Sequence, residues 1–169
     1  MGQGTPAPEL GANSAMHIEQ VSPARTDVRG LIRQSDEQLA KLYPPESNHL
    51  ESSDDLTKLN VLMLGAFSNG ALVGIGAVKI RVEDVAYGEI KRVFVTLGFR
   101  GQGISKLIMA ELERRLIENQ IGVSRLETGI AQPEAIGLYK GLGYVERSPF
   151  GSYQADPLSV FMEKNLSVL

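Results

Sequence analysis

Residues 89–112 read EIKRVFVTLGFRGQGISKLIMAEL, which is a strand pattern, a glycine-containing turn and the start of a helix in immediate succession. Branched and aromatic residues lead up to Val95, and apolar residues recur at helical spacing from Ile104 onward. We therefore predict a strand over residues 87–95, a turn, and an amphipathic helix over residues 104–117.

The turn has the features of a binding site for a pyrophosphate group. A helix amino terminus leaves N–H groups unpaired and carries partial positive charge, and Gly101 and Gly103 would let a phosphate approach the backbone. Arg100 adds a cation and Ser105 a hydroxyl donor. The alternative is that the glycines only shape a tight turn. Neither a Walker loop nor a dinucleotide fingerprint fits the spacing.

The rest of the chain predicts an α/β (α+β) fold, with a mixed, mainly antiparallel sheet and helices on both faces. Asn69-Gly70 separates two apolar runs and indicates a hairpin. Pro44-Pro45 must end the helix that precedes it. The further elements that we expect are strands over 17–21, 61–67, 71–82, 124–130 and 159–163, and helices starting at Asp27 and Pro133.

Length and composition predict one globular domain with a short leader. The chain has 169 residues, within the usual size of one domain. Residues 1–15 are rich in Gly, Pro and Ala, so we expect them to be a flexible leader or an extension added to the native chain. Residues 16–169 form the predicted domain.

Charge and composition exclude several classes of protein. With 17 basic and 20 acidic residues, the net charge is −3, which gives no support to nucleic-acid binding. There is no cysteine and there are only two histidines, so no metal site is expected. No apolar run is long enough to cross a bilayer and no signal-peptide pattern is present, so we expect a soluble, cytoplasmic protein with no membrane partner.

Two motifs resemble the GNAT superfamily of acetyl-coenzyme A-dependent acyltransferases. Arg100, Gly103 and Ser105 match Arg/Gln-x-x-Gly-x-Gly/Ala at a helix start, with Ser105 a mild departure. Residues 132–139, QPEAIGLY, followed by Gly143-Tyr144, match the second signature, with Gln132 and Tyr144 departing mildly. The resemblance extends from about Met16 to the carboxyl terminus. It implies a GNAT-like acyl-CoA N-acyltransferase fold and acetyl-CoA as co-substrate, with no metal.

The resemblance also implies residue roles. Tyr139 occupies the position whose phenol protonates the leaving thiolate in many members, and Glu89 the position of the general base in some. Strict alternation would put Glu89, Lys91, Val93 and Val95 on one face. An ion pair with Lys91 is the alternative for Glu89, and water is the alternative base. The cofactor-binding residues implied are Phe94, Val95, Arg100, Gly101, Gln102, Gly103, Ile104, Ser105 and Gln132.

Substrate-side residues are harder to predict, and five are candidates. Glu127 could bind a cationic amine or brace the sheet. Lys91 and Arg92 should point to opposite faces of their strand, so that one of them would favour an acceptor with a carboxylate. The loop residues Tyr43, His49 and Tyr153 could cover an acceptor pocket.

The sequence thus predicts an N-acetyltransferase that moves an acetyl group from acetyl-CoA to a primary amine of a small molecule, by direct attack in a ternary complex. One alternative is a protein lysine or amino-terminal acetyltransferase. Another is a non-catalytic acetyl-CoA sensor. A homodimer is common among proteins with this resemblance, and the sequence leaves the oligomeric state open.

Overall fold

The computed structural model describes residues 16–48 and 55–167 of the chain. The predicted leader, residues 1–15, and the candidate residue His49 lie outside these ranges.

One mixed sheet of seven strands organises the chain, in the order β1-β2-β3-β4-β5-β7-β6. Only the β4–β5 pair of these strands is parallel, and the other neighbours are antiparallel. The strands are β1 Met16–Gln20, β2 Val61–Ser68, β3 Ala71–Val82, β4 Ala86–Val95, β5 Val123–Gly129, β6 Val145–Arg147 and β7 Ser159–Asn165. The helices are α1 Thr26–Leu42, α2 Ile104–Glu118 and α3 Pro133–Gly141, with 3-10 turns η1 Pro45–Ser47, η2 Asp55–Thr57 and η3 Leu97–Phe99.

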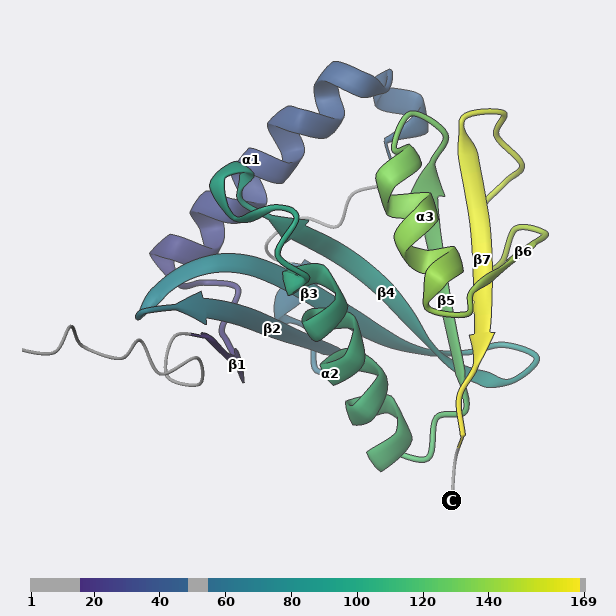
Figure 1. Cartoon of the computed structure of the whole chain (residues 1–169). Coiled ribbons are helices and arrows are strands. Elements are labelled where there is room, and N and C mark those ends of the chain that lie inside the picture. The colour runs from purple at the N-terminus through teal and green to yellow at the C-terminus, as the bar shows by residue number, and fades with distance from the viewer. Residues whose placement is uncertain (1–15, 49–54, 168–169) are drawn as a thin grey trace, which may run out of the picture.

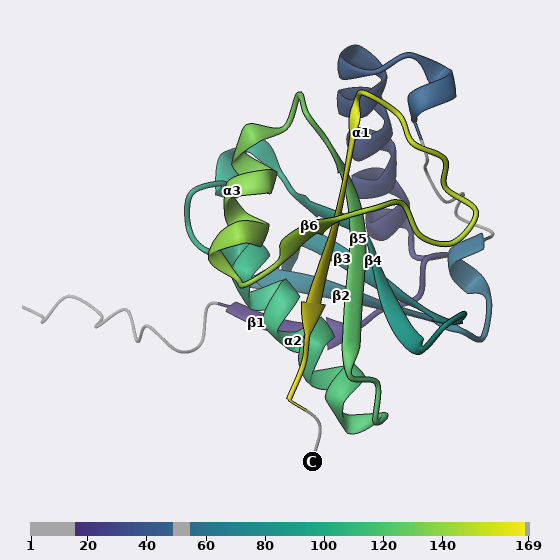
Figure 2. The ribbon, with the colours of Figure 1, turned by 90° about the vertical axis from the view of Figure 1, so that its right-hand side faces the viewer.

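Helices cover both faces of the sheet, as predicted. Helix α1 lies on one face, and α2 and α3 lie on the other (Figures 1 and 2). The α1 face buries Val28, Leu31 and Ile32 against the sheet, whereas Ile108 and Leu112 of α2 are fully buried on the opposite face. None of the described helices is both long and apolar enough to cross a membrane.

Most of the predicted elements are confirmed to within a few residues of their ends. Asn69 and Gly70 both have positive φ, 48° and 83°, which is the geometry of a tight hairpin turn between β2 and β3. Helix α1 ends at Leu42, directly before Tyr43 and the two prolines. Strand β6 was not predicted, because three residues are too few to establish a periodicity.

The prediction that strict alternation holds along β4 is wrong, because β4 contains a bulge. Ala77 of β3 lies opposite Lys91 and Ile75 opposite Phe94, so β4 has one residue more than β3 between these pairs. Arg92, at the bulge, has a φ of 57°. Glu89 and Lys91 therefore lie on the α1 face, and Val93 and Val95 on the face of α2.

The bulge also corrects the prediction that Lys91 and Arg92 point to opposite faces. Arg92 forms an ion pair with Asp36 of α1, so its side chain lies on the α1 face as well. Lys91 shares the face of Ala77, which packs against α1. Two consecutive cations thus face the same side of the sheet.

The two central strands diverge soon after they pair. The parallel register joins only residues 88–90 of β4 to residues 124–126 of β5, although both strands continue beyond these residues. Figure 1 shows β4 and β5 together at one end and apart at the other. The sheet therefore opens between its central strands.

We expect Leu112→Ala to lower the free energy of unfolding by about 2–5 kcal/mol, because a fully buried leucine of α2 would leave a cavity in the core. Urea denaturation followed by circular dichroism measures the change. Leu107→Ala is the control, because Leu107 of the same helix is 48% exposed and its loss should cost less than about 0.5 kcal/mol. Equal losses for the two variants would contradict the assigned orientation of α2.

Candidate functional site

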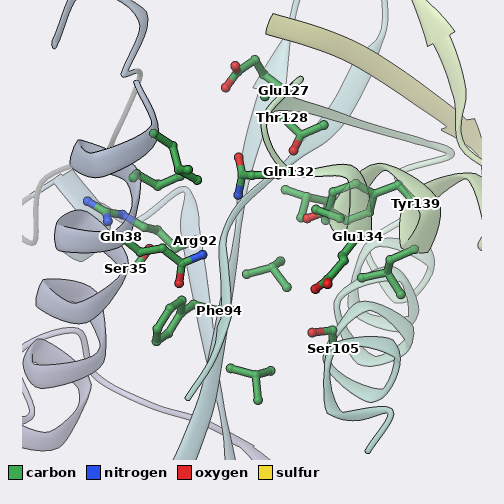
Figure 3. Close-up of a pocket in the computed structure, with 18 of the residues that line it drawn as sticks. Ser35, Gln38, Arg92, Phe94, Ser105, Glu127, Thr128, Gln132, Glu134 and Tyr139 are labelled. Atoms are coloured by element: carbon green, nitrogen blue, oxygen red, sulfur yellow. The ribbon is translucent and has the colours of Figure 1, made fainter. Parts of the chain in front are cut away.

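A cavity of about 610 Å³ lies where β4 and β5 diverge. Its lining comes from α1, the second half of β4, the turn before α2, the end of β5, and α3. Figure 3 shows Ser35 and Gln38 on the α1 side, and Ser105, Glu134 and Tyr139 on the side of α2 and α3. The cavity therefore joins the two faces of the sheet.

The glycine turn has the geometry that a phosphate site requires. Gly101 and Gly103 have φ values of 77° and 78°, and Gly103 is the residue that caps the start of α2. A Cβ added at either glycine would meet no atom within 4 Å, so protein packing does not explain the absence of a side chain. Open space beside backbone N–H groups at a helix start suits an anion.

The Arg100 side chain is held against β4 and α1. Its Nε donates to the Val95 carbonyl at 2.9 Å, and its Nη2 donates to Oε1 of Gln38 at 2.6 Å. The guanidinium also lies 5.4 Å from the centre of the Phe94 ring. Arg100 thus braces the divergent part of β4, and its contribution of a cation to a phosphate site stays a prediction.

Glu89 is enclosed by partners. Its side chain is 1% exposed, and Oε1 lies 3.4 Å from Nη1 of Arg81. Its Oε2 lies 3.2 Å from Nζ of Lys91 and accepts a 2.6 Å hydrogen bond from the Tyr153 hydroxyl. Lys91 in turn donates to that hydroxyl at 3.0 Å. This geometry favours the ion-pair interpretation of Glu89, since its carboxylate holds the lysine and the tyrosine in place.

Glu127 at the end of β5 also lines the cavity, and its protonation differs from that of an ordinary carboxyl group. Burial raises the pKa of Glu127 to about 7, and the charges of Glu89 and Asp156 add to the increase while Lys91 opposes it. A carboxyl group with this pKa exchanges its proton near neutral pH, as a general base requires.

Tyr139 of α3 reaches the same cavity from the opposite side. Burial raises its pKa to about 12, and the charge of Glu127 contributes to the increase. The ring packs edge-on against Tyr144, with 5.9 Å between the centroids. The phenol therefore keeps its proton at neutral pH and has one to donate.

Tyr43 connects the two sides of the cavity. Its hydroxyl donates to Oε1 of Gln132 at 3.3 Å and accepts from the Ala131 N–H at 3.1 Å. A Cβ on Gly129 would lie 1.9 Å from this hydroxyl, so the glycine makes room for the tyrosine. Tyr43 thus ties the end of α1 to the loop between β5 and α3.

Nearly all of the predicted site residues within the described ranges line this one cavity. The exception is Gln102, which lies in the turn but is not part of the lining. The residues that the cavity brings together are Tyr43, Glu89, Lys91, Phe94, Val95, Arg100, Gly101, Gly103, Ile104, Ser105, Glu127, Gln132, Tyr139 and Tyr153.

Several lining residues were not predicted from the sequence, among them Ser35, Gln38, Thr128 and Glu134. The position of Ser35 could have been predicted from the sequence, because this polar residue continues the spacing of the apolar residues of α1. The structure shows it buried. Gln38 and Thr128 belong to no motif, and Glu134 stands at a variable position of the signature over residues 132–139. Within residues 16–48 and 55–167, no group of three or more His, Asp or Glu side chains is arranged to hold a metal ion.

Comparisons with known proteins find related sequences over most of the chain. The model of the acetyltransferase (GNAT) family matches residues 29–144. A protein of Azospirillum brasilense named IAA acetyltransferase is 41% identical over 149 residues, which cover 88% of this chain and 97% of that protein.

Solved structures share the fold. One from Klebsiella pneumoniae, provisionally described as an acyl-CoA N-acyltransferase, is 34% identical with a TM-score of 0.75 and covers 90% of this chain and 98% of its own. The PaiA N-acetyltransferase of Thermoplasma acidophilum, solved in complex with coenzyme A, has a TM-score of 0.72 over 89% of this chain and 99% of its own. Because its sequence is only 20% identical to this chain, the similarity supports the fold alone.

We expect Glu127→Gln to stabilise the protein relative to the parent increasingly as the pH rises from 5 to 8. A carboxyl whose pKa is raised from 4.5 to about 7 contributes stability below pH 4.5 and loses it as the pH rises through 7. Glutamine does not ionise, so the variant does not lose this stability as the pH rises. Melting temperatures across the pH range measure the difference.

Glu146→Gln is the control for this comparison, because the Glu146 side chain is 62% exposed. Its melting-temperature difference from the parent should change little with pH. If the melting-temperature difference of Glu127→Gln also stays constant with pH, the desolvation of the Glu127 carboxyl that the structure indicates is contradicted.

Proposed function

Since the chain belongs to the acetyltransferase (GNAT) family, we propose that it transfers the acetyl group of acetyl-coenzyme A to a primary amine of a small molecule. The observation that carries the proposal is the cavity between β4 and β5, which runs from the glycine turn to the α1 face. A cofactor on one side and an acceptor on the other would meet between the diverging strands.

The residues on the α2 side fit coenzyme A. The positive-φ glycines Gly101 and Gly103 leave open space at the start of α2, where backbone N–H groups favour a pyrophosphate. Beyond Ile90, β4 is not paired with β5, so its edge there is available to the pantetheine arm, apart from the Val95 carbonyl that Arg100 binds. Acetyl-CoA supplies the acetyl group as a reactive thioester.

Two hydrogen-bonded connections cross the acceptor side, which favours a small molecule over a protein chain. The Ser47 hydroxyl of η1 donates to Oδ2 of Asp156 at 2.6 Å, joining the segment after α1 to the loop before β7. Tyr43 makes a second connection on this side through Gln132. A flexible protein segment would have to pass beneath these links, whereas a small amine fits within the cavity.

Proton transfer has a candidate on each side. In the proposed reaction the amine nitrogen forms a bond to the acetyl carbon, the carbon–sulfur bond breaks, and the leaving thiolate takes a proton from Tyr139. Glu127 suits the base that accepts the amine proton better than Glu89 does, because Arg81, Lys91 and Tyr153 occupy the Glu89 carboxylate. A water molecule is the alternative to Glu127 as the group that accepts the amine proton.

Gly103→Glu should weaken acetyl-CoA binding by roughly 10- to 100-fold, because it places a carboxylate at a positive φ beside the phosphate site. Isothermal titration calorimetry measures the affinity. Gly30→Glu is the matched control, because Gly30 lies in α1 with no atom within 4 Å of an added Cβ. Unchanged binding by Gly103→Glu, or no binding by the parent, would refute the cofactor assignment.

Tyr139→Phe should lower kcat by roughly 100-fold and leave acetyl-CoA affinity unchanged, because only the proton donor is lost. Free thiol release with the best acceptor of an amine panel measures kcat. Tyr144→Phe is the comparison, because Tyr144 is an adjacent buried tyrosine outside the cavity lining. If both variants keep the parent rate, Tyr139 is not the acid.

A further inference from the structure

The hydroxyl of Tyr43 is held in one position at the wall of the cavity. Tyr43 lies directly after α1, is 8% exposed and lines the cavity. A Cβ on Gly129 would lie 1.9 Å from the hydroxyl oxygen, so the end of the phenol occupies the space that the glycine leaves. The same oxygen contacts the backbone of Ala131 and the side chain of Gln132. These contacts connect α1 with the residue directly before α3.

The two hydrogen bonds of this hydroxyl fix the direction in which the Gln132 amide points. The Ala131 N–H, at 3.1 Å, can only donate, so the hydroxyl oxygen accepts there and its own proton needs an acceptor. Oε1 of Gln132 lies 3.3 Å away and takes that proton. Burial raises the pKa of Tyr43, so the phenol keeps its proton at neutral pH. An amide turned the other way round would leave the phenol proton without this acceptor.

The amide nitrogen of Gln132 is consequently turned into the cavity. Gln132 is the residue that caps the start of α3, but its side chain makes no capping hydrogen bond. Its Nε2 has no hydrogen-bond partner among the described residues. Figure 3 shows the nitrogen directed into the open part of the cavity and the oxygen directed away from it. An amide donor is therefore available to a ligand.

A pantetheine arm on the open edge of β4 would offer an acceptor to this donor. The arm contains two amide groups, and a trans amide carries its N–H and its C=O on opposite sides of the chain. An arm amide that donates to a carbonyl of β4 thus turns its own C=O away from that strand. Gln132 lines the cavity on the side of β5 and α3, across the opening from β4.

We propose that Tyr43 is a positioning residue of the coenzyme site, because its hydroxyl fixes the Gln132 amide so that Nε2 donates to a carbonyl oxygen of the pantetheine arm. This inference rests on the proposed function and adds a residue to the same site. Tyr43 acts through Gln132 and takes no part in the transfer of the acetyl group. Its contribution is to the affinity for the coenzyme.

Calorimetry with two ligands tests the proposal. One is coenzyme A, and the other is 3′-phospho-ADP, the part of the coenzyme that lacks the pantetheine arm. Gln132→Met removes the donor, and Tyr43→Phe removes the hydroxyl while keeping the ring beside Gly129. Each should weaken coenzyme A binding by roughly 3- to 10-fold, the contribution of one neutral hydrogen bond, and 3′-phospho-ADP binding by less than about twofold.

A double variant separates positioning from support of the fold. If Tyr43 acts through Gln132, Tyr43→Phe should add less than about twofold to the loss that Gln132→Met causes alone. Tyr87→Phe is the matched control and should bind both ligands as the parent does. Tyr87 is fully buried outside the cavity lining, and its hydroxyl has no hydrogen-bond partner among the described residues.

Three results would overturn the inference. Tyr43→Phe could bind coenzyme A as tightly as the parent, the affinity for 3′-phospho-ADP could fall as much as that for coenzyme A, or the two losses could multiply in the double variant. In each case the parent still binds coenzyme A, so the proposed function is unaffected. Failure of the parent to bind coenzyme A or acetyl-CoA would instead refute the proposed function itself.

Discussion

The site depends on the loss of hydrogen bonding between β4 and β5. Their parallel register ends at Ile90 and Leu126, and from there the strands diverge. A sheet that stayed paired would have no cavity at its centre, because neighbouring strands lie only about 5 Å apart. The divergence exposes strand edges inside the protein, where a ligand can use their N–H and C=O groups.

The elements around the opening hold it in place from both faces. Arg100 binds the Val95 carbonyl and Gln38 of α1, so the free end of β4 is fixed to that helix. Tyr43, directly after α1, fixes the carboxyl end of the same helix to the loop that follows β5. Helix α1 therefore spans the two diverging strands. Its contacts explain why residues far apart in the chain form one site.

The two carboxyl groups in the cavity, those of Glu89 and Glu127, have different surroundings, and the surroundings decide the chemistry of each group. Glu89 is enclosed by Arg81, Lys91 and Tyr153, an environment that suits a structural counter-ion. Glu127 is also largely buried, but burial dominates over its neighbours and holds its pKa near neutrality. Two carboxylates in one cavity are thus suited to different roles.

Sequence reasoning found fewer than half of the residues that line the cavity, in part through the resemblance to the GNAT family. The patterns of the sequence alone determined the order of the elements and the glycine turn. These follow from local patterns: apolar periodicity defines α2, and Gly101 and Gly103 stand where a helix starts. Only the tertiary structure decided which residues face one another. The bulge at Arg92 changed the phase of β4, and a single extra residue reverses every side chain after it. The partners of Glu89 and the burial of Glu127 arise from contacts between distant segments, which no local pattern encodes.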